Sequence, residues 1–141
     1  MKVHLHRLGK TNELERFVTR MELGEPFHYD APFIFIAKQH GNIIFINAFM
    51  LEKEKDVVMP RFVHMLLDPV IRRSKLGVNL LIQSENYLKL LGYTETFAYI
   101  LKTNRKMSVL ARKFGYKAER EDDKAVYYFK QLIREPILTI A

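Results

Sequence analysis

A short basic segment of this chain has the residue types and the spacing that bind phosphate. It reads Asp68-Pro69-Val70-Ile71-Arg72-Arg73-Ser74-Lys75-Leu76-Gly77, and a predicted helix follows it. The first turn of a helix has backbone N–H groups that find no acceptor inside the helix, and it is the positive end of the helix dipole. Arg72, Arg73 and Lys75 add positive charge at the same place. We therefore expect this segment to bind the phosphate groups of a small molecule.

The elements that must position this segment follow from hydrophobic periodicity and from turn residues. Their order is strand, helix, three strands, helix, strand, helix and two strands, which indicates a mixed α/β fold. Strands are predicted over residues 3–8, 31–39, 43–51, 57–67, 94–101, 116–120 and 125–133. Helices are predicted to open at Asn12, Gly77 and Asn104 and to end before Gly24, Gly92 and Gly115.

Two local patterns support these bounds. Asn12 and Glu15 have the spacing of a capping box, with Asn12 as the N-cap of the first helix. His40-Gly41-Asn42 separates two runs rich in Phe and Ile, which indicates an antiparallel hairpin. Four aromatic residues of this hairpin are expected in the core: Phe33, Phe35, Phe45 and Phe49.

The composition is typical of one globular domain. The chain has 141 residues, of which 48% are hydrophobic and 28% are charged, and it has no cysteine, which excludes disulfides and cysteine zinc ligands. No apolar stretch approaches the ~20 residues that a membrane span needs, and residues 1–7 lack the features of a signal peptide. We therefore expect a single domain over residues 1–141, without a membrane association, in the cytoplasm (the host cytoplasm if a phage encodes it).

The positive charge is concentrated in the second half. The net charge is +7, and residues 1–70 carry nine basic and nine acidic side chains, so residues 71–141 supply the whole excess. Such a basic half attracts a polyphosphate cofactor or a nucleic acid, or it is simply a solvated face. Because the excess begins at the predicted phosphate segment, we favour a role directed at a ligand.

This order of elements resembles the GNAT N-acyltransferase superfamily, whose members transfer an acyl group from acyl-coenzyme A. In the family's cofactor motif, a strand with Val-x-Pro precedes Arg/Gln-x-x-Gly-x-Gly/Ala and a helix with Leu-Leu. Leu67-Asp68-Pro69, residues 72–77 and Leu80-Leu81 fall at the matching spacing. Lys75 replaces the first glycine: it is strained there if the position needs a positive φ, and otherwise its ammonium can contact a phosphate.

A second segment is similar to the family's Asn-x-x-Ala-x-x-Leu-Tyr-x-x-x-Gly-Phe element. Asn104, Leu110, Gly115 and Tyr116 fall in register, the last in place of Phe. Ala111 stands in the place of the tyrosine that often protonates the leaving thiolate. The resemblance covers residues 1–133 in topology and 65–116 in motif, and it points to a divergent member of the superfamily, for which a phage-type origin is one alternative.

The resemblance implies a fold, a cofactor and a set of contacts. The fold is a central mixed, mostly antiparallel sheet with splayed fourth and fifth strands and helices on its flanks. The cofactor is acetyl-coenzyme A as acyl donor, with its pantetheine arm paired to the backbone of the fourth strand and its pyrophosphate held by the amides that follow. The cofactor-binding residues implied are Met65, Leu66, Leu67, Arg72, Arg73, Ser74, Lys75, Leu76, Gly77, Val78 and Asn104.

Acyl transfer to an amine also needs a base for the amine and an acid for the thiolate. His64 is the candidate base, because it precedes the cofactor segment and imidazole has an unperturbed pKa of about 6.5; the alternative is a histidine satisfied at the sheet surface. Ser108 is the candidate acid, unless its hydroxyl bonds the helix backbone. Tyr99 and Tyr116 are alternative acids, although their side chains are also expected in the hydrophobic core.

Two other histidine segments carry weaker signals. His28-Tyr29-Asp30 lies where the family shapes its acceptor pocket, so it is either a substrate contact or an ordinary loop. His4 and His6 share a strand face, but the sequence offers no third ligand near them, so we expect no metal site.

The sequence leaves three classes of amine acceptor open: a small molecule, a protein and a nucleic acid. It also leaves open whether the chain forms a homodimer. Two other functions compete with acyl transfer. The basic second half, Lys75 and Ala111 suit a nucleic-acid-directed protein on the same scaffold, similar to the phage Mom-type DNA modifiers. A non-catalytic structural protein, such as a virion component, is the other alternative, since a fold does not settle a function.

Overall fold

The computed structural model describes residues 1–72 and 74–132. Arg73, the last residue of the predicted final strand (Ile133) and the tail that follows it lie outside the described residues. The strands are β1 (His4–Leu5), β2 (Phe33–Gln39), β3 (Asn42–Glu54), β4 (Val57–Leu67), β5 (Glu95–Leu101), β6 (Lys117–Glu121) and β7 (Ala125–Gln131). The helices are α1 (Asn12–Arg20), α2 (Lys75–Leu90) and α3 (Arg105–Lys113), and a short 3-10 turn, η1 (Pro69–Ile71), links β4 to α2.

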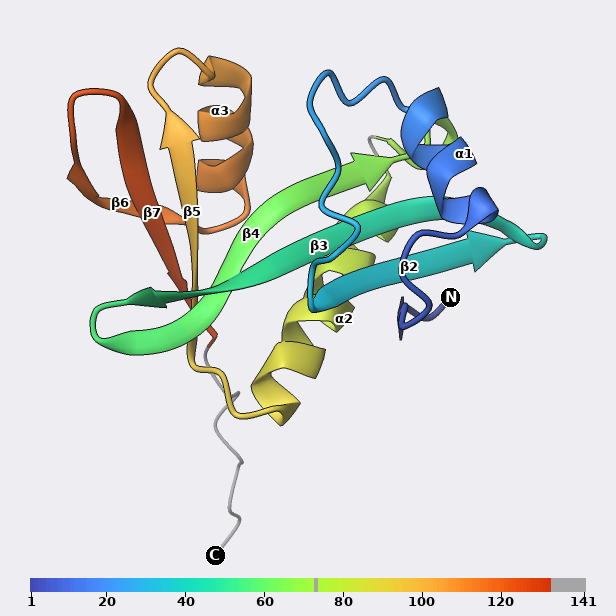
Figure 1. Cartoon of the computed structure of the whole chain (residues 1–141), viewed down its shortest axis with the longest axis horizontal. Helices are drawn as coiled ribbons and strands as arrows, with labels where there is room; N and C mark the ends of the chain where they lie inside the picture. Colours follow the sequence, from blue (N-terminus) through green and yellow to red (C-terminus); the bar gives the residue numbers. More distant parts are fainter. Residues whose placement is uncertain (73, 133–141) are drawn as a thin grey trace, which may run out of the picture.

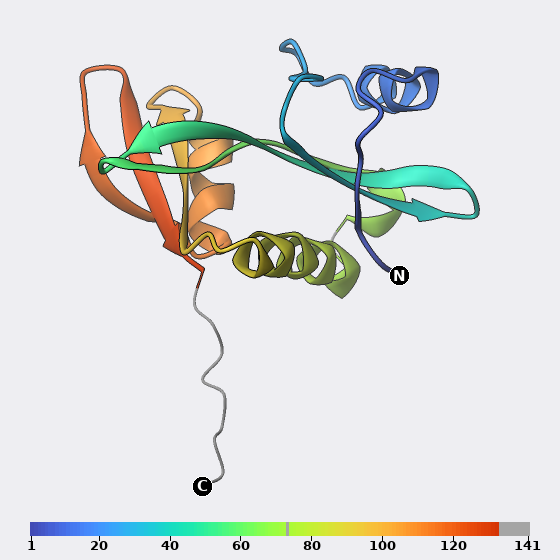
Figure 2. The same ribbon diagram turned by 60° about the horizontal axis from the view of Figure 1, so that its bottom comes forward.

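The strands form one mixed sheet between two helical layers. Its order is β1-β2-β3-β4-β5-β7-β6, and every neighbouring pair is antiparallel except β4 and β5, which are parallel. In Figure 2, α1 lies on one side of the sheet, whereas α2 and α3 lie on the other. The predicted order of elements and the mixed α/β class are therefore confirmed.

Each helical layer covers its own cluster of apolar side chains. Leu14 and Phe17 of α1 pack with Ile34 and Ile46 of the sheet. On the opposite face, Leu88 of α2 packs with residues of β2, β3 and β5. The four hairpin phenylalanines predicted for the core are all buried: Phe33, Phe35, Phe45 and Phe49.

The central feature of the sheet is the divergence of β4 and β5. Their ladder contains a single pair, Arg61 with Phe97, and the two strands then separate (Figure 1). A bulge lies next to this point: Ala48 of β3 pairs with His64 and Phe49 pairs with Phe62, so Val63 is an extra residue in β4. A bulge bends the strand that carries it. The splay that the family resemblance implies is therefore present.

Three predicted bounds are corrected by local hydrogen bonds. The N-cap of α1 is Thr11, not Asn12, because the Thr11 hydroxyl accepts the Leu14 N–H at 3.2 Å. The first strand contains only His4–Leu5, which form the two ladder pairs with β2, and the His6 N–H adds one hydrogen bond to Ile34 O at 2.7 Å. Helix α2 begins at Lys75, two residues before Gly77, because Ser74 caps it.

Candidate functional site

The divergence of β4 and β5 opens a cleft of about 420 Å³. Its walls come from β4, β5, the start of α3 and the segment between α1 and β2, which crosses over β3 and β4 in Figure 1. Apolar side chains of α3, Met107 and Leu110, line it together with Met65 of β4. The polar residues that line it are Glu25, His28, Arg61, His64, Tyr99, Asn104 and Lys106.

The edge of β4 along this cleft offers backbone hydrogen-bonding groups. Beyond Arg61, β4 has no ladder partner on its β5 side within residues 1–72 and 74–132. Met65, Leu66 and Leu67 lie on this stretch, as the predicted pantetheine site requires. One of its carbonyls is already in use, because the Arg72 side chain donates from Nε to Leu67 O at 3.0 Å.

The predicted phosphate segment ends in a capped helix start. Ser74 Oγ accepts the Leu76 N–H at 3.3 Å and donates to Ile71 O at 2.6 Å. The other amides of the first turn have no acceptor inside the helix, as at any helix start. Lys75 is the first residue of α2 and does not have a positive φ, so it carries no backbone strain. Its exposed ammonium adds positive charge at this helix start.

Gly77 lies in the first turns of α2, against β4. It is buried, it has no positive φ, and an added Cβ would make ordinary contacts, at 3.5 Å, with both methyl carbons of Leu67. Neither its backbone conformation nor the packing around it therefore requires a glycine, and its contact with a cofactor stays a prediction. Val78 in the same turn is exposed.

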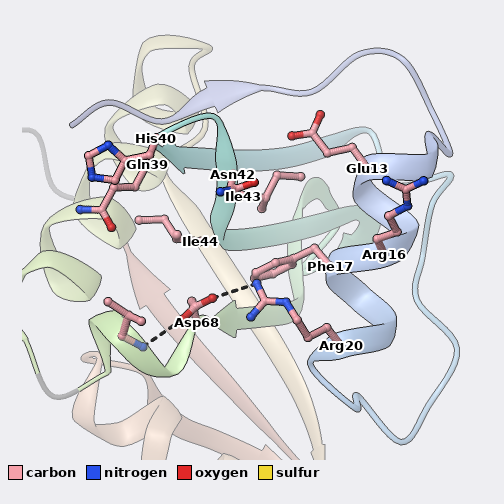
Figure 3. A pocket seen from close by; sticks show the side chains of 11 residues that line it. Glu13, Arg16, Phe17, Arg20, Gln39, His40, Asn42, Ile43, Ile44 and Asp68 are labelled. Carbon is pink, nitrogen blue, oxygen red and sulfur yellow. Dashed lines mark hydrogen bonds and ion pairs between the residues drawn. The ribbon is translucent and has the colours of Figure 1, made fainter.

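A second hollow, of about 580 Å³, lies between α1, the β2–β3 hairpin and the end of β4 (Figure 3). At its edge, Asp68 Oδ2 forms an ion pair with Arg20 at 2.8 Å, while Oδ1 accepts the Val70 N–H at 2.9 Å. The Val70 amide and the Arg20 guanidinium hold the pKa of Asp68 below its ordinary value. This hollow is larger than the cleft, but none of the residues that line it belongs to β5, and its one Asp68–Arg20 ion pair holds the turn before α2.

His64 lies in the cleft wall, buried to 2% exposure, between two aromatic neighbours. Phe27 stacks on its ring at 4.8 Å between centroids. Its Nε2 accepts the His28 backbone N–H at 3.3 Å and lies 2.8 Å from His28 Nδ1. Burial, together with the nearby His28 and Arg61, lowers the pKa of His64 to about 4. The ring is therefore uncharged at neutral pH.

The structure does not bring the predicted acid, Ser108, next to His64. Ser108 lines a different hollow, together with Arg105, Arg112 and Tyr128. Tyr116 lies in the core, where its hydroxyl meets Thr96 Oγ1 at 2.9 Å and where burial raises its pKa.

Tyr99 and Asn104 both line the cleft. The Tyr99 side chain is 38% exposed, so it is not a core residue, and partial desolvation and the nearby Asp122 raise the pKa of its hydroxyl. Asn104 caps α3 by accepting the Met107 N–H at 3.2 Å, which leaves its side-chain amide N–H groups as donors.

Sequence reasoning did not connect His28 with His64. The two residues are 36 positions apart and belong to different elements, so no local pattern relates them. Among the described residues, no group of three or more His, Cys, Asp or Glu side chains could hold a metal ion. None of the described helices is both long enough and apolar enough to cross a membrane.

Comparisons with known proteins agree with this architecture. No protein-family model matches the sequence, and no curated protein matches it significantly. The structure is similar to a GNAT-family acetyltransferase from Staphylococcus aureus, with a TM-score of 0.66 at 14% identity, covering 94% of this chain and 99% of that one. The chain therefore has the fold of the GNAT-family acetyltransferases.

Two further similar structures contain coenzyme A or an analogue. Arabidopsis thaliana Naa50, in complex with the bisubstrate analogue CoA-Ac-MVNAL, has a TM-score of 0.64 at 15% identity, covering 92% of this chain and 99% of that one. The PaiA N-acetyltransferase of Thermoplasma acidophilum, in complex with coenzyme A, has a TM-score of 0.62 at 16% identity, covering 93% and 99%.

Proposed function

We propose that this chain, which has the GNAT fold, binds acyl-coenzyme A between β4 and β5 and transfers the acyl group to an amine. The observation that carries the proposal is the cleft itself: beyond Arg61 the edge of β4 that borders it has no ladder partner among the described residues, and η1 and the start of α2 follow β4 along the chain. An extended amide chain with a pyrophosphate at one end is complementary to such an arrangement. The coenzyme A complexes of Naa50 and PaiA support the choice of donor.

Each part of the site has a separate task. The amides of the first turn of α2, with Lys75 and Arg72, bind the pyrophosphate. The backbone of β4 at residues 65–67 and the Asn104 side chain hydrogen-bond the pantetheine arm. Met107 and Leu110 exclude water from its apolar side. Bound in this way, the donor supplies an activated thioester carbonyl, and the chain orients it toward the part of the cleft wall that His28 and His64 form.

Calorimetry of the full chain with acetyl-coenzyme A tests this proposal. We expect saturable binding that Lys75→Glu weakens by about ten- to a hundredfold, because a phosphate contact becomes a repulsion. An acidic residue in the first helical turn suits the helix dipole, so this variant keeps its stability. Lys53→Glu is the matched control, because it makes the same change of charge at an exposed position of β3. We expect it to leave binding unchanged. No saturable heat with millimolar acetyl-coenzyme A would overturn the proposal.

A nucleic acid is the second candidate partner, as the carrier of the acceptor amine. The surface of α3 presents Arg105, Lys106, Arg112 and Lys113, all exposed, and none of these four is ion-paired within the described part of the chain. Binding to duplex DNA that falls steeply with salt would support this candidate. Affinity that does not change between low and moderate salt, or no binding at low salt, would remove it.

A further inference from the structure

Two histidines from separate elements form a pair in the lining of the cleft. His64 lies on β4, and His28 belongs to the segment that connects α1 to β2 and crosses over β4. The His64 ring has a fixed orientation, because Phe27 stacks on it and the His28 backbone N–H donates to its Nε2. His28 is only half-buried and lines the cleft beside it.

The hydrogen bonds of this pair determine where each ring carries its proton. A backbone N–H can only donate, so Nε2 of His64 is an acceptor, and the proton of the neutral ring is on Nδ1. That Nδ1 lies 3.5 Å from Glu25 Oε1. The contact of 2.8 Å between His28 Nδ1 and His64 Nε2 then requires His28 Nδ1 to donate. The unprotonated nitrogen of neutral His28 is therefore Nε2, on the side of the ring away from His64.

We propose that His28 is the base of the acyl transfer and that His64 is a positioning residue that holds His28 by accepting its Nδ1–H. This inference rests on the proposed function. The His64 ring is buried and its acceptor nitrogen is already occupied by His28, so it cannot take a proton from a substrate in the cleft. His28 Nε2 is free to do so, and the imidazolium that forms still donates its Nδ1–H to the neutral His64 ring.

In this step His28 accepts the proton that the amine loses. The amine nitrogen bonds to the thioester carbonyl carbon, its surplus proton passes to His28 Nε2, and the carbon–sulfur bond breaks. The thiolate leaves and takes a proton from solvent, while the His28 imidazolium returns its proton to water.

The titratable and charged groups that line the cleft together with the pair are Glu25 from the α1–β2 segment, Arg61 from β4, Tyr99 from β5 and Lys106 from α3.

Conservative substitutions separate the two roles. An Asn side chain at position 28 places an amide donor where Nδ1 is, so His28→Asn keeps the contact to His64 but removes Nε2. A Gln side chain at position 64 places an acceptor where Nε2 is, so His64→Gln keeps His28 in position, whereas His64→Ala does not. The probes are acetyl-coenzyme A and n-hexylamine, with thiol release as the readout.

We expect His28→Asn to lower kcat/KM by about 10²–10⁴-fold and to lose the acidic limb of the pH profile, with coenzyme A affinity unchanged. His64→Gln retains more activity than His64→Ala. Independently of turnover, ¹⁵N NMR at pH 8 should find both rings protonated on Nδ1. A His64 proton on Nε2, or equal thiol release by His28→Asn and the wild type, overturns the assignment while the proposed function stands. A wild type that fails to bind coenzyme A overturns both.

Discussion

The carboxylate of Asp68 lies 2.8 Å from the guanidinium of Arg20, and this ion pair joins α1 to the turn that precedes α2. The same carboxylate accepts the N–H of Val70, the middle residue of η1. Asp68 therefore holds the start of the proposed phosphate site from two directions, even though it contacts no ligand in the proposal.

Removal of Asp68 should cost more than removal of its partner. Asp68→Ala loses the Val70 hydrogen bond and leaves the guanidinium unpaired, which should lower the free energy of unfolding by about 1–2 kcal/mol. Arg20 is more than half exposed, so Arg20→Ala should cost only about 0.2–1 kcal/mol. Urea denaturation of the two single variants and the double variant gives both values and their coupling. Equal costs for the two single variants would contradict this account.

His64 should make the stability depend on pH. Its pKa is about 4 in the folded chain and about 6.5 when unfolded, so between these values the unfolded chain binds a proton that the folded chain excludes. The free energy of unfolding should thus fall as the pH drops from about 6.5 to 4, by about 3 kcal/mol in total from this residue.

His64→Gln provides the comparison for this pH effect. Urea denaturation at several pH values should show the advantage of the wild type over His64→Gln shrinking toward pH 4, while contributions from all other groups cancel in the difference. Stability curves that stay parallel across this range would show that His64 does not carry the effect.

A buried ion pair ties α2 to β7. Lys130 Nζ lies 2.9 Å from both carboxylate oxygens of Glu85; burial raises the pKa of Glu85, and Lys130 opposes this shift. Lys130→Met should lower the free energy of unfolding by about 3–5 kcal/mol, because it leaves a buried carboxylate without a partner. Chemical denaturation of the double variant, Lys130→Met with Glu85→Gln, should show that part of the lost free energy of unfolding is recovered. A double variant less stable than Lys130→Met would contradict this interpretation.

The family tyrosine should not fit at position 111. Ala111 is 6% exposed and packs in the cluster that contains Ala98, Ile100 and Tyr128, so Ala111→Tyr should cost about 1–3 kcal/mol through overpacking. Leu110 lines the cleft and is only partly buried, so Leu110→Tyr should be tolerated better. Thermal unfolding of the two variants checks this, and equal Tm values would show that the site at 111 has room for the ring.

Local patterns were sufficient for the order of the elements and for the presence of a helix start after the basic segment. Apolar periodicity and glycine turns predict the order of strands and helices correctly, since each signal acts within a few residues. The basic segment at 72–77 likewise predicts a helix start, although Lys75 and not Gly77 begins it. The roles of the residues at this start remain predictions.

Contacts between distant segments lie beyond such patterns. The width of the cleft depends on a bulge at Val63 and on the single ladder pair of β4 with β5. Neither feature can be recognised from the periodicity of apolar residues in the sequence. His64 likewise meets His28 only because the α1–β2 segment crosses β4. Burial then removes water from that ring, which lowers its pKa, and in our proposal His64 therefore positions His28 and is not itself the base. Solvation and hydrogen-bond direction are properties of the assembled chain, because they depend on which side chains meet in space.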